Sequence, residues 1–395
     1  MVATLIRGAA VHSTGCPCTV ITERAVAHEL PEYTLRIAID PALKNGVLDE
    51  DSASELIKKT YAGQSCVCII KDGKPDTIYW IAYNYDAAKK WQTGNESYIL
   101  GKKLESSERI CAEGAGASLR SSVVKDKIAV VTGGAQGFGE EIVRGLAASG
   151  AQIFIADLNI DGAEKLAQEI NAAQKRTAAF AVKVNVADEE SVEAMFKTIV
   201  ETTGGLDLCV SNAGVLKAAS VLEQDLHSFK FVTDINYTGF FLISKHAARL
   251  LRLQNRSAPD WKTDIIQINS KSGFEGSNKN GAYSGGKFGG IGLVESFALE
   301  LIEYNIKVNA ICPGNFFDGP LWSNPEKGLF AQYLQTGKVP GAKTVADVKA
   351  YYENKVPMKR GCTGPDVMRA LYYIVEQEYE TGQAVPVTGG QVMLH

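Results

Sequence analysis

Apolar runs alternate with amphipathic segments along the chain from Lys125 onward. In the longer segments apolar residues recur every three or four positions, the spacing of a helix with one buried face. Strands that alternate with helices form a parallel sheet covered on both faces. The pattern predicts a doubly wound α/β domain with a seven-stranded parallel sheet over residues 122–395. The runs are "KIAVVT" (127–132), "AQIFIAD" (151–157), "AAFAVKV" (178–184), "LDLCVS" (206–211), "DIIQIN" (264–269), "IKVNAIC" (306–312) and "AVPVT" (384–388).

The first 121 residues have a different pattern, which predicts a separate small α+β domain. "YTLRIAID" (33–40) indicates a strand, and Asp51 or Ser52 can cap a helix through "ASELIKKTY" (53–61). "CVCIIKDGKPDTIYWIAYNY" (66–85) predicts a hairpin that turns at Asp72-Gly73. The Gly-, Ala- and Ser-rich stretch 111–122 is the expected linker. We expect this domain of unassigned role to dock on the larger one or to mediate assembly.

Composition and charge narrow the possible partners. The chain has 395 residues, which favours two or three domains, and its mean hydropathy of -0.06 is typical of a soluble protein. A net charge of -4 argues against nucleic acid or an anionic membrane as the main partner. No apolar run approaches the roughly 18 residues of a membrane span, and the N-terminus lacks the features of a signal peptide. The sequence therefore predicts a cytoplasmic protein with a small-molecule substrate.

The eight cysteines are too sparse for a disulfide scaffold, and most lie in apolar runs, which predicts buried reduced thiols. Cys16-Pro-Cys18 and Cys66-Val-Cys68 form Cys-x-Cys pairs, but this is not a usual zinc spacing. We therefore expect no metal.

A glycine-rich loop follows the first predicted strand of the large domain. "TGGAQGFG" (132–139) leads into an amphipathic helix, so its backbone can approach a pyrophosphate at the helix N-terminus, as in a Rossmann-type fold. Asp157 ends the second strand eighteen residues after Gly139, where a carboxylate can bind both ribose hydroxyls and repel a 2′-phosphate. No cation follows in the loop or after Asp157, which predicts NAD. The competing interpretation is that Asp157 caps the next helix.

"NSKSGFEGSNKNGAYSGGKFGG" (269–290) holds the candidate catalytic residues. Tyr283 and Lys287 are four residues apart, so both lie on one face of a helix, and Ser270 ends the preceding strand. A nearby ammonium lowers the pKa of a tyrosine and allows it to act as a base. Ser270 can hydrogen-bond the substrate oxygen. The three groups predict a site for alcohol–carbonyl redox chemistry.

Along the chain the motifs come in the order glycine loop, Asp157, "NAG" (212–214), Asn236, Ser270, Tyr283, Lys287 and "PG" (313–314). This order resembles that of the short-chain dehydrogenase/reductase family, over about residues 125–395. The resemblance implies a catalytic set of Asn236, Ser270, Tyr283 and Lys287, in which the asparagine holds a water that links the lysine to solvent. It also implies a homo-oligomer, a dimer or a tetramer. Asn185 and Asp318 depart from the family pattern, which has aspartate near the adenine and threonine near the nicotinamide carboxamide. The implied cofactor residues are Gly133, Gln136, Gly137, Phe138, Gly139, Asp157, Asn185, Val186, Asn212, Ala213, Gly214, Tyr283, Lys287, Pro313 and Gly314.

Five further stretches resemble the sorbitol-6-phosphate 2-dehydrogenase branch of that family, which converts D-sorbitol 6-phosphate to fructose 6-phosphate with NAD. They are 268–273, 283–293, 313–322, 355–362 and 388–394. Lys271 follows the candidate serine, where its ammonium can bind a phosphate or point to solvent. Lys355, Lys359 or Arg360 can supply a second anchor, and Asn315 is a further candidate substrate residue.

Two alternatives stay open at this point. One is an NAD-dependent dehydrogenase of an unphosphorylated polyol or other secondary alcohol. The other is a regulatory protein that senses NAD, against which the complete set of Ser270, Tyr283 and Lys287 argues.

Overall fold

The computed structural model describes residues 120–256, 261–326, 328–335 and 337–393, the strands at 66–71 and 74–80, and Thr4, Arg7 and Gly8. Strands β1 (Cys66–Lys71) and β2 (Lys74–Trp80) pair antiparallel, which confirms the predicted hairpin. The predicted strand at 33–40, the helix at 53–61, most of the linker, and Cys16 and Cys18 lie outside the described residues.

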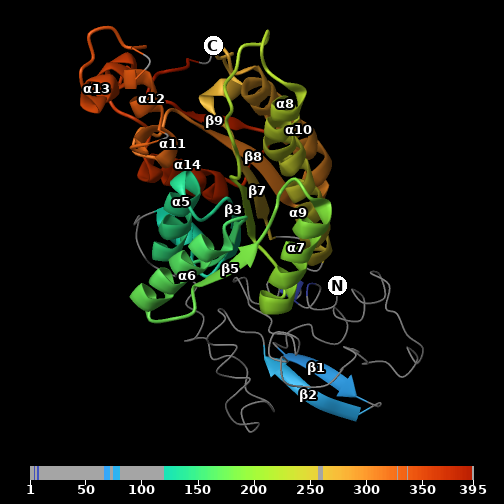
Figure 1. Ribbon diagram of the computed structural model, residues 1–395. Helices are drawn as coiled ribbons and strands as arrows, with labels where there is room; N and C mark the ends of the chain where they lie inside the picture. The colour runs from blue at the N-terminus through green and yellow to red at the C-terminus, as the bar shows by residue number, and fades with distance from the viewer. Residues whose placement is uncertain are drawn as a thin grey trace.

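A seven-stranded, wholly parallel sheet forms the centre of the large domain (Figure 1), as predicted. The strand order is β5-β4-β3-β6-β7-β8-β9, so the direction of winding reverses between β3 and β6. Ligands of such sheets bind at the carboxyl ends of the strands near this reversal. The strands are β3 (Ile128–Thr132), β4 (Gln152–Asp157), β5 (Ala179–Lys183), β6 (Leu208–Ser211), β7 (Thr263–Ile268), β8 (Ile306–Pro313) and β9 (Ala384–Val387).

Helices cover both faces of the sheet. One face packs against α5 (Gly137–Ala148), α6 (Ile160–Gln174) and α14 (Gly364–Glu376), and the other against α7 (Glu189–Thr203), α9 (Gly239–Asn255) and α10 (Gly281–Leu301). This double cover explains why the central strands are continuous apolar runs rather than alternating ones. Helix α8 (Leu226–Thr233) continues through a π-helical turn (Asp234–Thr238) into α9.

The segment between β8 and α14 forms a small aromatic cluster of its own. It contains the helices α11 (Pro320–Ser323), α12 (Leu329–Gln335) and α13 (Val345–Lys355). Phe317 and Trp322 pack edge to face with ring centroids 5.0 Å apart, and Phe330 and Tyr352 lie against the same indole. This segment therefore has a core separate from the two that flank the sheet.

The burial of the cysteines and the length of the helices also bear on the sequence-based expectations. Cys209, Cys312 and Cys362 are buried free thiols, as the apolar runs predict. Among the described residues, no helix combines the length and apolar character needed to cross a bilayer.

Glycines allow helix α10 to approach its neighbours closely. A Cβ on Gly289 would lie 2.8 Å from the Tyr237 ring, and one on Gly290 would lie 2.6 Å from the Gln267 side-chain nitrogen. A Cβ on Gly286 would lie 3.5 Å from the Cβ of Asn236. The glycine-studded sequence of this helix thus sets its distance from β7 and from the π-helical turn.

This packing predicts opposite effects for two glycine substitutions in one helix. Gly290→Ala should destabilise the protein by about 1–3 kcal/mol, because its methyl group overpacks Gln267 and Asn269. Gly292→Ala, with nothing within 4 Å of its Cβ, should stabilise by about 0.5–1 kcal/mol through helix propensity. Urea unfolding of both variants measures the difference, and equal effects would show that the close approach is unimportant.

Candidate functional site

The predicted site residues lie at the carboxyl ends of strands β3 to β8, on one edge of the sheet. The glycine loop follows β3, Asp157 ends β4, Asn185 follows β5, Asn212 follows β6, Ser270 follows β7 and Pro313 ends β8. Because all these strands are parallel, residues far apart in sequence meet at this edge.

The glycine loop after β3 is built for close backbone approach. Gly133 has φ +62°, and a Cβ there would lie 2.9 Å from the Cα of Ala213. A Cβ on Gly139 would overlap the carbonyl oxygen of Gly133. Asn212 fixes the loop by donating from Nδ2 to the carbonyl oxygens of Thr132 and Gly133, both at 3.0 Å. The structure thus brings together the loop and the Asn212 to Gly214 segment.

Asp157 lies beside the same loop. Its Oδ2 accepts a hydrogen bond from the Ala135 backbone at 3.0 Å, and Oδ1 accepts one from the Asn159 backbone at 2.9 Å. The next helix is capped by Asn159, whose side chain accepts from Gly162, and not by Asp157. The competing interpretation of Asp157 as a helix cap is therefore wrong.

Three further cofactor candidates are Asn185 and Val186, which follow β5, and Phe138 of the glycine loop. Val186 is buried beneath Gly239, whereas Asn185 is exposed and its Oδ1 accepts from the Ala187 backbone. Phe138, from the glycine loop, stacks on Phe316 of the loop after β8 with ring centroids 4.4 Å apart. The stack joins the two loops.

Around the loop after β8, Gln391 provides a contact that the sequence did not reveal. Its side-chain oxygen accepts from the Asn315 backbone at 3.2 Å, and a Cβ on Gly314 would collide with it. The C-terminal segment therefore holds the Pro313-Gly314 turn in place.

Tyr283 and Lys287 share one face of α10, opposite the end of β7. Burial raises the pKa of Tyr283, and a hydrogen bond with Ser270 opposes this rise. Lys287 Nζ lies 5.7 Å from the centre of the Tyr283 ring and donates to the Ile268 carbonyl at 2.9 Å. Burial lowers the pKa of Lys287 to about 8. The structure thus brings Ser270, Tyr283 and Lys287 together, but it does not depress the pKa of the tyrosine as the sequence argument expected.

Asn236 lies in the π-helical turn, an uncommon geometry that is frequent at functional sites. Its side-chain amide is tied at both ends to Val215, donating to the carbonyl at 2.7 Å and accepting from the N–H at 3.1 Å. A Cβ on Gly214 would lie 2.7 Å from Asn236 Oδ1 and 3.8 Å from Lys287 Nζ. Asn236, Gly214 and Lys287 therefore border one small space.

Asn269 is a positioning residue that sequence reasoning missed. Its Oδ1 accepts from the Ser270 backbone at 2.8 Å, and its Nδ2 donates to the Lys287 carbonyl at 2.9 Å. One buried side chain thus orients both the serine loop and helix α10. The available signal was a polar residue between the end of β7 and Ser270.

The candidate phosphate anchors differ in their surroundings. Arg360 forms an ion pair with Asp366, Lys359 Nζ donates to the Asn354 carbonyl at 2.7 Å, and Lys355 Nζ lies 4.3 Å from the Tyr351 ring centre. Lys271 lies in a 3₁₀ turn (Lys271–Gly273) right after Ser270, and its side chain makes no ion pair or hydrogen bond with the described residues. Lys271 is therefore the least engaged of the four.

Asp318, at the position where the family pattern has threonine, is bound to a residue of another helix. Its Oδ1 forms a 2.6 Å ion pair with Lys349 of helix α13. The loop after β8 is thereby connected to the aromatic cluster segment.

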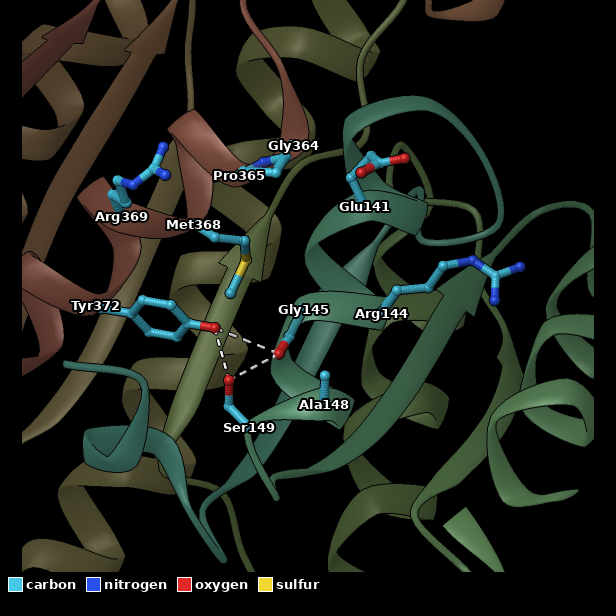
Figure 2. A pocket seen from close by; sticks show the side chains of 10 residues that line it. All are labelled: Glu141, Arg144, Gly145, Ala148, Ser149, Gly364, Pro365, Met368, Arg369 and Tyr372. Carbon is cyan, nitrogen blue, oxygen red and sulfur yellow. Dashed lines mark hydrogen bonds between the residues drawn. The ribbon is translucent and has the colours of Figure 1, made fainter. Parts of the chain in front are cut away.

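A cavity of about 600 Å³ lies elsewhere, between α5 and α14 (Figure 2). Met368 and Tyr372 line it, and Tyr372 shares a hydrogen bond with Ser149 at 2.6 Å. None of the predicted catalytic or cofactor residues lines this cavity.

Comparison with known proteins agrees with the fold and the motifs. The sequence pattern of the family described as short chain dehydrogenase matches residues 127–324. The chain therefore belongs to the short-chain dehydrogenase family and is an oxidoreductase of that family.

Among individual relatives, the chain is 39% identical over 274 residues to sorbitol-6-phosphate 2-dehydrogenase of Escherichia coli, a match that covers 68% of this chain and 99% of that protein. It is 31% identical to galactitol 2-dehydrogenase of Agrobacterium fabrum, with 68% and 99% covered. The crystal structure of sorbitol-6-phosphate 2-dehydrogenase from Erwinia amylovora superposes with a TM-score of 0.62 at 40% identity, covering 67% of this chain and all of the other.

Burial of Lys287 predicts a pH-dependent stability difference. Because the pKa of Lys287 is lowered to about 8, the unfolded chain binds a proton between about pH 8 and 10.5 that the folded chain does not. The cost of burying the ammonium is therefore greatest below pH 8. Lys287→Met should be more stable than the parent protein at pH 7 by on the order of 1–3 kcal/mol, and the difference should shrink toward pH 10.

Urea unfolding at pH 7 and pH 10 measures this difference. Substitution of an exposed lysine, Lys197→Met, is the control and should leave stability nearly unchanged at both pH values. A Lys287→Met variant that is equally destabilised at both would contradict the inferred cost of burial.

Proposed function

We propose that this protein is an NAD-dependent dehydrogenase that interconverts a sugar alcohol phosphate and a ketose phosphate, most specifically sorbitol 6-phosphate and fructose 6-phosphate. The observation that carries the proposal is the convergence of Ser270, Tyr283 and Lys287 near Gly214, in the segment that contacts the glycine loop. The similarity to sorbitol-6-phosphate 2-dehydrogenases of two bacteria supports the choice of substrate.

The residues of the glycine loop fit a dinucleotide. Gly133 and Gly139 let the loop fold tightly against itself and against Asn212, and the loop leads into the N-terminus of α5, where a pyrophosphate would be stabilised. Asp157 would hold the adenosine ribose, and its negative charge favours NAD over NADP. When bound, NAD supplies the acceptor for a hydride from the substrate carbon and can return it.

Tyr283 serves as the base that takes the hydroxyl proton of the substrate. Burial opposes formation of the phenolate, whereas the hydrogen bond from Ser270 favours it. Lys287 keeps its charge below about pH 8 and lies on the same helix face, so its ammonium also favours the phenolate. Ser270 holds the substrate oxygen close to Tyr283, and Asn236 supports a water that connects Lys287 with solvent.

Lys271 binds the substrate phosphate, assisted by Asn315. Lys271 lies next to the catalytic serine and has no partner among the described residues, so phosphate binding breaks no existing ion pair. Arg360 would first have to leave Asp366.

We also propose that the protein forms a homo-oligomer, a dimer or a tetramer. Helices α8, α9 and α10 carry exposed aromatic residues, with Phe231, Phe241 and Phe288 each at least 40% exposed. Exposed apolar side chains of this size are characteristic of surfaces that bind other proteins.

The second candidate is a dehydrogenase of unphosphorylated polyols, which the similarity to galactitol 2-dehydrogenase favours. Absorbance of reduced nicotinamide with sorbitol 6-phosphate, mannitol 1-phosphate and free sorbitol, each with NAD or NADP, separates the candidates. Turnover of free sorbitol alone would exclude the phosphate site, and turnover with NADP alone would exclude the role of Asp157.

Removal of the tyrosine hydroxyl tests the proton transfer. Tyr283→Phe should lower kcat by about 10²–10⁴-fold, since general base catalysis is lost. Binding of NAD, followed by quenching of protein fluorescence, should change little. Retained turnover would exclude Tyr283 as the base.

Removal of the Lys271 ammonium tests the phosphate contact. Lys271→Ala should raise KM for sorbitol 6-phosphate by about 10–100-fold, the loss of one charge-assisted hydrogen bond. Activity on free sorbitol should stay unchanged. Lys359→Ala, whose ammonium already binds the Asn354 carbonyl, serves as the control and should have a smaller effect. Equal losses on both substrates would remove Lys271 from the phosphate site.

A further inference from the structure

A buried group of charges lies at the amino ends of the strands, the sheet edge opposite the candidate site. Lys127 precedes β3, Asp207 precedes β6, Asp264 belongs to β7 and Lys307 to β8. Lys307 and Asp264 are both at most 3% exposed and form an ion pair at 3.0 Å. The fifth member, Arg7, comes from the N-terminal region, about 200 residues away in sequence.

Arg7 binds this edge through both terminal nitrogens of its guanidinium group. Nη2 donates to Asp207 Oδ2 at 2.7 Å, and Nη1 donates to Asp207 Oδ1 at 3.1 Å and to Gln254 Oε1 at 2.7 Å. The side chains of Arg7 and Asp207 are both 0% exposed. Such a two-pronged contact matches a guanidinium and not an ammonium.

Gly205 makes room for the arginine. A Cβ at this position would lie 2.7 Å from Arg7 Cδ and would collide with Gln254 Oε1. Gln254 is fixed from the other side, because its Nε2 donates to the Leu206 carbonyl at 2.9 Å. Gly205, Asp207 and Gln254 together form what we call the guanidinium pocket.

The contact of Arg7 has a geometric component in addition to its charge. Among the described residues, Lys127 and Lys307 lie near Asp207 and Asp264, and Arg7 joins this group as a further cation. Asp207 also accepts hydrogen bonds from the Ile128 backbone at 2.8 Å and from Trp261 Nε1 at 3.2 Å. Arg7 adds two hydrogen bonds to Asp207, one to Gln254 and one to the Leu206 carbonyl, in a space that Gly205 leaves open.

We propose that the guanidinium pocket is an anchoring site for the chain's own N-terminal segment, with Arg7 as its ligand. The first part of the chain is then fixed to the dehydrogenase domain at two places, through Arg7 and through the covalent connection before β3. Arg7 lies outside residues 127–324, the part of the chain that matches the short chain dehydrogenase family, and the match to the Escherichia coli relative covers 99% of that protein but 68% of this chain.

Coupling between Arg7 and Gly205 in the full-length protein tests the proposal. Arg7→Met and Gly205→Ala should each lower the midpoint of thermal unfolding by about 5 °C or more, because each empties the pocket. The double variant should be no less stable than the weaker single variant, since both changes remove the same contact. Arg144→Met is the control, because Arg144 forms only exposed ion pairs, and its midpoint should stay the same.

Hydrogen exchange at residues 4–8 gives an independent measurement. Exchange there should rise at least tenfold in Arg7→Met and in Asp207→Asn, but not in Arg144→Met. If Gly205→Ala alone is insoluble, hydrogen exchange in Arg7→Met and Asp207→Asn decides the question without it. Additive midpoint shifts or unchanged exchange in Arg7→Met would each overturn the anchor.

Discussion

Burial of the Lys287 ammonium is the constraint on which the rest of the candidate site depends. Its hydrogen bond to the Ile268 carbonyl requires helix α10 to lie directly on the end of β7, and glycines on the facing side of the helix make that distance possible. The same approach places Tyr283 beside Ser270 and lets Asn269 bind the Lys287 carbonyl. A single desolvated cation therefore links strand, helix and serine loop, at a cost in stability.

The charged side chains at the two edges of the sheet differ in their burial and in their partners. At the carboxyl edge, polar side chains such as Asp157 and Asn236 are held by hydrogen bonds to the backbone, and among the described residues Lys271 has no ion pair. At the amino edge, charges are fully buried and bound to one another. Burial raises the pKa of Asp264, whereas Arg7 and Lys127 outweigh the effect of burial and hold the pKa of Asp207 below its ordinary value. The parallel arrangement of strands makes this separation possible, because all strands present equivalent ends to each edge.

Much of this arrangement was predictable from local sequence, and the exceptions have a common reason. The apolar runs predicted all seven strands, and the glycine loop, Asp157 and the Tyr283–Lys287 spacing placed these residues on the correct edge. Such signals depend on residues close in sequence. The Arg7–Asp207 pair joins residues 200 positions apart, and the Asp318–Lys349 pair depends on how α13 folds back. The raised pKa of Tyr283 was also missed, because burial depends on the complete fold and not on the neighbouring lysine.

The location of the two attachment points bears on how an enzyme of this family can grow. Arg7 binds at the amino edge, and the covalent connection enters the domain just before β3 at that same edge. A segment that precedes the domain is therefore held at the edge of the sheet opposite Tyr283. The sequence of such a segment can be altered without a change in the loops that surround Tyr283, since the length of the strands separates the two edges.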